Sequence, residues 1–193
     1  MNKKDIHLKK VRRPKRPKKL PKLISDDSLN KINSIANLKH KAILLLTYGT
    51  GMRISEVVNV KLSDINKVQN NENSSSTILI RNSKGNKDRY VPVSHALARI
   101  LNNYVKMYRP KGYLFNGQAS PSYSTSSCSK IVKKYLGANY TFHQLRHTYA
   151  TKALDAGNDI HSVADQLGHS SIKTTEIYLH MTENRLLNRK HIT

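Results

Sequence analysis

The sequence predicts a mostly α-helical (α+β) domain that carries a small antiparallel β-sheet, and three observations support this. Apolar residues recur at helical spacing over most of the chain, between glycines and prolines that mark segment ends. One region, TILIRNSKGNKDRYVPV at 77–93, instead has two short apolar runs around a polar turn, as in a β-hairpin. The chain has 193 residues, of which 37% are hydrophobic, enough to bury one core.

The first predicted helix begins after Ser25, which is a suitable N-cap. Asp26 and Asp27 follow it, where the dipole of a helix favours acidic side chains. An apolar stripe at helical spacing extends this helix through Leu29, Ile32, Ile35 and Ala36.

Two further helices and a loop are expected before the hairpin. HKAILLLTYGTGM at 40–52 is apolar nearly all round, which predicts a buried helix ended by Gly49 and Gly51. RISEVVNV at 53–60 starts another helix. The polar stretch NKVQNNENSSS at 66–76 predicts a solvated loop.

The second half of the chain is again helical in pattern. Gly85 and Asn86 suit the hairpin turn, and Pro110 closes a helix expected at 94–108. A serine-rich loop is expected at 119–129. The remaining predicted helices, with Gly157 and Gly168 between the last three, are KIVKKYLGA at 130–138 and the segments 143–156, 159–167 and 171–180.

Charge is the most pronounced global property, with 34 Lys and Arg against 12 Asp and Glu and a formal net charge of +22. Residues 1–22 contain eleven Lys and Arg and one Asp, and their +10 leaves +12 for the rest of the chain. A polyanion is therefore the expected partner, and nucleic acid is the polyanion that this charge favours. A solubilising tail or a membrane-surface patch are the alternatives, but Pro14, Pro17 and Pro21 break any amphipathic helix here. The cations expected to track the DNA backbone are Arg12, Arg13, Lys15, Arg16, Lys18 and Lys19.

The compartment expected for this chain is the cytoplasm, with association with the nucleoid when DNA is bound. Cys128 is the single cysteine, so no intramolecular disulfide can form. The sequence has no apolar run of about 18 residues and no secretory signal at residues 1–20, so no membrane partner is expected.

The stretch TFHQLRHTYAT at 141–151 places two histidines and an arginine close together on a predicted helix. Its H-x-x-x-H spacing also occurs in zinc proteases, but Gln144 stands where their catalytic Glu would be. Arg146 beside the pair would repel a dication, and few further ligands are available. No metal is therefore expected, whereas guanidinium and imidazole both suit a phosphate oxyanion.

Four motifs in order strengthen the phosphate interpretation: GTGMRISEVVNV at 49–60, SKGNKDRYVPV at 83–93, HQLRHTYAT at 143–151 and LGHSSIKTTEIYLH at 167–180. With this order and spacing, residues 23–182 resemble the tyrosine recombinases, the phage integrase and Xer-like family. The resemblance implies an integrase-type fold and a DNA strand transferase that forms a 3′-phosphotyrosyl intermediate. It also implies a catalytic set of six residues, namely Arg53, Lys84, His143, Arg146, His169 and Tyr178.

The chemistry of this family accounts for the residue types. Tyr178 would attack a DNA phosphate, and because a phenol has a pKa near 10 it needs a proton acceptor, for which His143 is the better candidate. Arg53 and Arg146 would clamp the charged phosphate oxygens, with a hydrogen bond from His169. Lys84, at the hairpin tip, would protonate the departing 5′-oxygen.

Two further residues are assigned supporting positions. Glu56, one turn after Arg53, stands where the family often has an acid that orients the first arginine. His147 is expected to be a buried structural partner rather than a catalyst. No cofactor is expected, because the guanidinium pair replaces a metal ion's charge and no P-loop pattern for ATP occurs.

The chain departs from the family in its organisation. Residues 1–22 are expected to form a basic, proline-containing arm and 23–193 the catalytic domain, and we expect no counterpart here of the N-terminal core-binding domain that typical members carry. Either a truncated piece of a longer enzyme or a naturally short member would have this organisation. Assembly on DNA, from dimer to tetramer, is expected, with no small-molecule substrate. The outcome would be integration, excision or inversion of a DNA segment, as in a mobile element. A catalytically silent DNA-binding regulator and a type IB topoisomerase-like enzyme remain as alternatives.

Overall fold

The structure is a computed structural model that describes residues 21–67, 76–83 and 87–187. Predictions for Lys84, Gly85, Asn86 and the cations at 12–19 lie outside the described residues. The helices are α1 (Asp26–Asn30), α2 (Leu38–Thr50), α3 (Ile54–Asn59), α4 (His95–Tyr108), α5 (Thr125–Tyr135), α6 (Phe142–Asp155), α7 (Ile160–Leu167) and α8 (Glu176–Leu187). The strands are β1 (Ile65–Lys67), β2 (Ser76–Ser83) and β3 (Lys87–Val93), and three short 3₁₀ helices are η1 (Lys31–Ser34), η2 (Leu62–Asp64) and η3 (Ile172–Thr174).

Side-chain caps explain where many helices begin. In six of the described helices, the residue before the first turn accepts a hydrogen bond from the amide three residues later, which satisfies a donor that the helix itself cannot pair. These caps are Ser25, Asn37, Ser94, Ser124, Thr141 and Asp159.

Helices α2 and α7 each end at a glycine in the left-handed region of backbone conformation. Gly51 caps α2 with φ 67°, and Gly168 caps α7 with φ 65°. A side chain is strained in this region, so glycine is favoured at both ends. The prediction for Gly51 is confirmed, whereas Gly49 lies inside α2 and does not end it.

The predicted antiparallel sheet is confirmed, with the order β1-β2-β3. Ile78 of β2 pairs with Ile65 on one side and Val91 on the other, and Ile80 pairs with Arg89. The predicted loop at 66–76 is wrong at both ends, because β1 extends to residue 67 and β2 begins at residue 76. A three-residue edge strand obtains its hydrogen bonds from its neighbour, so it needs no apolar alternation of its own.

Three helix boundaries also differ from the prediction. The first helix ends at Asn30 rather than at Ala36, because the chain continues as the 3₁₀ helix η1 and is extended at Ile35, before Asn37 caps α2. The serine-rich loop is shorter than predicted, because Ser124 caps α5 and residues 125–129 are helical. The final helix begins at Glu176 rather than 171, after the turn of η3.

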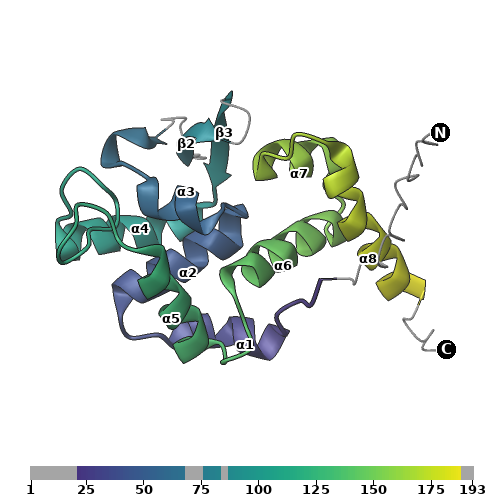
Figure 1. The fold of residues 1–193 in the computed structure, drawn as a ribbon, viewed down its shortest axis with the longest axis horizontal. Coiled ribbons are helices and arrows are strands. Elements are labelled where there is room, and N and C mark those ends of the chain that lie inside the picture. Colours follow the sequence, from purple (N-terminus) through teal and green to yellow (C-terminus); the bar gives the residue numbers. More distant parts are fainter. Residues whose placement is uncertain (1–20, 68–75, 84–86, 188–193) are drawn as a thin grey trace, which may run out of the picture.

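The buried side chains form two clusters. The larger lies among α2, α3, the sheet, α4 and α5, and the smaller is built by α6, α7 and α8 around Ala150, Leu167 and Tyr178. Helix α6 runs from the larger part of the fold toward α7 and α8 (Figure 1). Residues at the boundary between the clusters are thus brought together from distant parts of the sequence. Within the described residues, no helix has the length and apolar character needed to span a membrane.

Candidate active site

The C-terminal end of α7 collects three arginines from three other elements. Arg89 Nε donates to the Gln166 carbonyl oxygen at 2.9 Å, Arg146 Nη2 to that of Leu167 at 2.7 Å and Arg53 Nη2 to that of Gly168 at 3.0 Å. The last carbonyls of a helix have no partner within it and lie at the negative end of its dipole. The backbone carbonyls at this helix end therefore bind three guanidinium groups without a cluster of acidic side chains.

Glu56 joins two of these arginines. Its Oε1 accepts from Arg53 Nη1 and Arg89 Nη1, each at 3.0 Å. Its Oε2 accepts from the Arg53 amide at 2.8 Å and from Arg89 Nη2 at 2.9 Å. Burial would raise the pKa of this carboxyl, but the hydrogen bonds and charge of Arg89, and then those of Arg53, lower it. Glu56 is therefore a charged acceptor that fixes the direction of both side chains.

Arg146 is buried on α6, with 5% of its surface exposed. Its Nη1 donates to the Gly51 carbonyl oxygen at 2.7 Å, so the side chain bridges the ends of α2 and α7. Burial, followed by repulsion from Arg53, lowers its pKa to about 10, which leaves it charged at neutral pH. A guanidinium group has five N–H donors. The Arg146 side chain uses two of them in the hydrogen bonds described here, and the Arg53 side chain also uses two. Both side chains can therefore donate further bonds to an anion.

Tyr178 on α8 lies between two histidines, with 4% of its surface exposed. Its hydroxyl lies 2.6 Å from His147 Nδ1, and its ring stacks on that of His169 with 6.4 Å between centroids. Burial raises the pKa of this phenol, and the nearby charge of Arg146 opposes the rise. The hydroxyl is thus held inside the fold, next to an imidazole and near a cation.

Both histidines beside Tyr178 favour the neutral form. Burial, and then the charges of His143 and Arg146, lower the pKa of His147. Burial, and then the charges of Arg146, Arg53 and others, lower the pKa of His169 to about 4. His169 Nδ1 lies 2.8 Å from the hydroxyl of buried Thr175, which orients the ring.

The structure brings most of the predicted site residues together. Arg53, Glu56, Arg146, His169 and Tyr178 converge on the end of α7 through the contacts described above. His147 contacts the tyrosine hydroxyl directly, whereas His143, expected as the acceptor, is exposed on the first turn of α6.

Sequence reasoning did not identify Arg89. A signal was present, because Arg89, Val91 and Val93 alternate along β3 on one face, and both valines are buried. An arginine in phase with buried residues needs a buried partner, and Glu56 supplies it.

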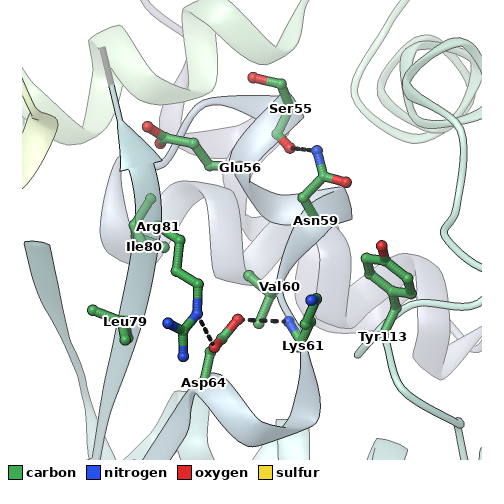
Figure 2. Close-up of a pocket in the computed structure, with 10 residues that line it drawn as sticks. All are labelled: Ser55, Glu56, Asn59, Val60, Lys61, Asp64, Leu79, Ile80, Arg81 and Tyr113. Carbon is green, nitrogen blue, oxygen red and sulfur yellow. Dashed lines mark hydrogen bonds and ion pairs between the residues drawn. The ribbon is translucent and has the colours of Figure 1, made fainter. Parts of the chain in front are cut away.

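A pocket lined in part by Glu56 adjoins the site (Figure 2). Buried Asp64 accepts from Arg81 Nε at 2.9 Å and from the Lys61 amide at 3.1 Å. Figure 2 shows the Glu56 carboxylate directed away from this pair. The described residues contain no group of three His, Cys, Asp or Glu side chains arranged to hold a metal ion.

Known proteins resemble this chain over nearly its whole length. Tyrosine recombinase XerA of Pyrococcus horikoshii is 39% identical over 190 residues, which cover 94% of this chain and 65% of the relative. Tyrosine recombinase XerD of Staphylococcus epidermidis is 31% identical, with coverage of 91% and 63%. The chain thus spans less than two thirds of the length of these relatives.

Solved structures share the fold. The crystal structure of XerA recombinase matches with a TM-score of 0.72 and 30% identity, over 92% of this chain and 67% of that one. A post-cleavage complex of the XerH site-specific recombinase with palindromic difH substrate matches with a TM-score of 0.73 and 26% identity, over 87% and 52%. The model of the phage integrase family matches residues 22–185. The chain therefore belongs to the phage integrase family, the tyrosine recombinases.

Proposed function

We propose that the chain carries the catalytic part of a site-specific DNA recombinase that cuts and rejoins strands through a phosphotyrosine. The observation that supports it best is the convergence of two arginines, two neutral histidines and the Tyr178 hydroxyl on one helix end. Relatives at 31–39% identity are named tyrosine recombinases, and one structural neighbour is a recombinase bound to its substrate after cleavage.

Tyr178 is the proposed nucleophile. Its oxygen attacks a DNA phosphorus, the bond to the 5′-oxygen breaks, and a 3′-phosphotyrosine and a 5′-hydroxyl result. The phenolic proton must pass to a base, and His147 is the neutral imidazole in hydrogen-bond contact with it. We therefore propose His147 as the immediate acceptor, with His143 as the alternative. Because the hydroxyl is buried, DNA binding must expose it before attack.

Arg53 and Arg146 are proposed to bind the non-bridging phosphate oxygens. Their remaining N–H groups and fixed positions suit the negative charge that develops on a pentacoordinate phosphate. His169 can add a hydrogen bond from Nε2 when the Thr175 hydroxyl donates to Nδ1. Lys84 remains the proposed general acid for the leaving 5′-oxygen.

The rest of the proposal concerns organisation and partners. Residues 1–22 act as a basic arm on DNA, and residues 23–193 carry the reaction. Double-stranded DNA is the substrate, on which copies assemble from dimer to tetramer, with no metal ion, ATP, membrane or small-molecule substrate. A DNA substrate is the reason to propose the cytoplasm, with association with the nucleoid, as the location.

A covalent-trapping experiment tests the reaction. Randomly nicked fragments of the source genome are incubated with wild-type chain or Tyr178→Phe, and protein–DNA adducts are precipitated after denaturation. We expect adducts with the wild type only. Equal signals from both proteins contradict the proposal, and DNA binding without adduct indicates a silent regulator. Relaxation of plasmids irrespective of their sequence indicates a topoisomerase-like enzyme instead.

His147 and His143 are separated by a second comparison, since both lie on α6. His147→Gln and His143→Gln are assayed for adduct formation across pH 6 to 9. The larger loss is expected for His147→Gln, together with a shift of the pH profile. A larger loss and shift with His143→Gln would make His143 the acceptor.

A further inference from the structure

Arg89 of β3 contacts the two parts of the fold that hold the Arg53 side chain, namely the Glu56 carboxylate and the C-terminal end of α7. Its Nη1 and Nη2 donate to the two oxygens of Glu56, at 3.0 and 2.9 Å, in a two-pronged ion pair. Its Nε donates to the Gln166 carbonyl oxygen, one residue before Leu167 and two before Gly168. One side chain therefore ties the strand, the carboxylate and the end of α7 together.

Arg89 restrains the rotation of the Glu56 carboxylate. Each oxygen accepts one bond from Arg53 and one from Arg89, so each arginine restrains the carboxylate that the other uses. Without Arg89, each oxygen would lose one of these bonds and the carboxylate could rotate. Arg53 would then lose a fixed partner for Nη1.

Arg89 itself is not placed to clamp a phosphate. At least three of its N–H donors are used within the protein, and its side chain is 11% exposed, against 25% for Arg53. It also shares the Glu56 carboxylate with Arg53. Its contacts instead fix other groups.

We propose that Arg89 is a positioning residue for strand cleavage, which holds Glu56 and the end of α7 and through them fixes Arg53 against the phosphate. This inference rests on the proposed function. The same contacts connect β3 to the site, so the strand that follows Lys84 in the sequence is anchored to the groups that hold Arg53. Positioning residues of this kind change activity by about 10- to 100-fold when removed.

The chain offers a matched control in Arg81, on the neighbouring strand β2. It also pairs with a buried carboxylate, Asp64, and the Glu56 carboxylate is directed away from this pair (Figure 2). Arg81→Gln therefore removes an arginine–carboxylate pair from the same sheet without touching the site.

The experiment measures single-turnover cleavage with protein in excess, on the duplex from which the wild type forms its adduct. Wild type, Arg89→Gln, Arg81→Gln and Glu56→Gln are compared on the natural phosphate and on a duplex with a methylphosphonate at the cleaved position. The methyl group removes the negative charge that Arg53 would stabilise, so a defect that acts through Arg53 should shrink on this probe.

We expect Arg89→Gln to cleave the phosphate about 10- to 100-fold more slowly, with most of that loss absent on the methylphosphonate. Arg81→Gln should match the wild type on both. Glu56→Gln should show the same pattern as Arg89→Gln. A variant that combines Arg89→Gln with Glu56→Gln, assayed alongside, should cleave no more slowly than the slower of the two single variants. If Arg89→Gln does not fold, Arg89→Lys, which keeps the charge but not the two-pronged geometry, replaces it with the same expectation.

Two results would overturn the inference while leaving the proposed function intact. One is an Arg89 variant that cleaves like Arg81→Gln. The other is a folded Arg89 variant whose loss is the same on both probes, which would mark a purely structural residue. If the wild type forms no adduct at all, the proposed function fails first.

Discussion

Substitution of Gly51 by alanine should damage both the fold and the site. Gly51 has φ 67°, and a methyl group there would lie 2.6 Å from Leu167 Cδ2 and also overlap the ring of Tyr149. The left-handed backbone costs about 1 to 2 kcal/mol for alanine. The overlap costs about 1 to 3 kcal/mol more, because Leu167 is fully buried and its side chain must shift within the core.

The sum is about 2 to 5 kcal/mol, which for a domain of this size lowers Tm by about 4 to 20 °C. Gly112→Ala is the matched control, because Gly112 has φ 69° and no atom lies within 4 Å of the added methyl. It should lose only the backbone part, about 1 to 2 kcal/mol. Thermal unfolding followed by circular dichroism measures both. A Gly51→Ala loss no larger than that of Gly112→Ala refutes the packing argument.

The same substitution should slow cleavage in protein that is still folded. Arg146 donates to the Gly51 carbonyl and to the carbonyl of Leu167, the residue that the new methyl would push. A displacement of about 1 Å at a reacting group can cost about 100-fold in rate. Cleavage assayed well below the Tm of the variant measures this effect, and an unchanged rate contradicts the assignment of Arg146.

Three further predictions concern pH, packing and charge. Because the pKa of His169 falls from 6.5 to about 4 on folding, the unfolded chain takes up this proton first, and stability should drop as pH falls from 6.5 toward 4. Tm measured across this range should depend less on pH in His169→Gln than in the wild type or in His161→Gln, an exposed control on α7. Asp64→Ala leaves the Lys61 amide without its acceptor and should cost about 1 to 3 kcal/mol in denaturant unfolding, against less than about 1 kcal/mol for Arg81→Ala, whose side chain is 53% exposed. Equal losses of unfolding free energy in the two variants would contradict the claim that Asp64 stabilises the fold mainly by accepting from the Lys61 amide. Replacing six arm cations by alanine should reduce the slope of log affinity against log salt by up to about 5, and an unchanged slope would remove the arm from the DNA contact; the six are Arg12, Arg13, Lys15, Arg16, Lys18 and Lys19.

Local chemistry made much of the fold predictable. Ser25 has the side chain that an N-cap needs, and Gly168 ends α7 in the left-handed region as its position suggested. The errors arise where neighbouring structure decides. Strand β1 has a polar sequence and exists because β2 pairs with it, and Gly49 is tolerated within α2 because that helix is packed on several sides.

The site was predictable in its residue types but not in its contacts. The four motifs placed Arg53, Arg146, His169 and Tyr178 in one catalytic set, because their order and spacing are specific. No local pattern states that Arg53 reaches the Gly168 carbonyl across 115 positions of sequence, or that Arg89 grips Glu56 across 33. These contacts depend on how α3, β3 and α7 pack, so only the folded chain reveals them.

The most direct test of the central claim is to identify the residue that carries DNA. Wild-type adduct is digested with nuclease and trypsin, and peptides that bear a nucleotide are sequenced by mass spectrometry. Tyr178 is the single tyrosine in the tryptic peptide that spans residues 174–185. We predict a nucleotide linked through its 3′-phosphate to Tyr178 in this peptide. A nucleotide on any other residue, or no nucleotide on this peptide, would contradict the account.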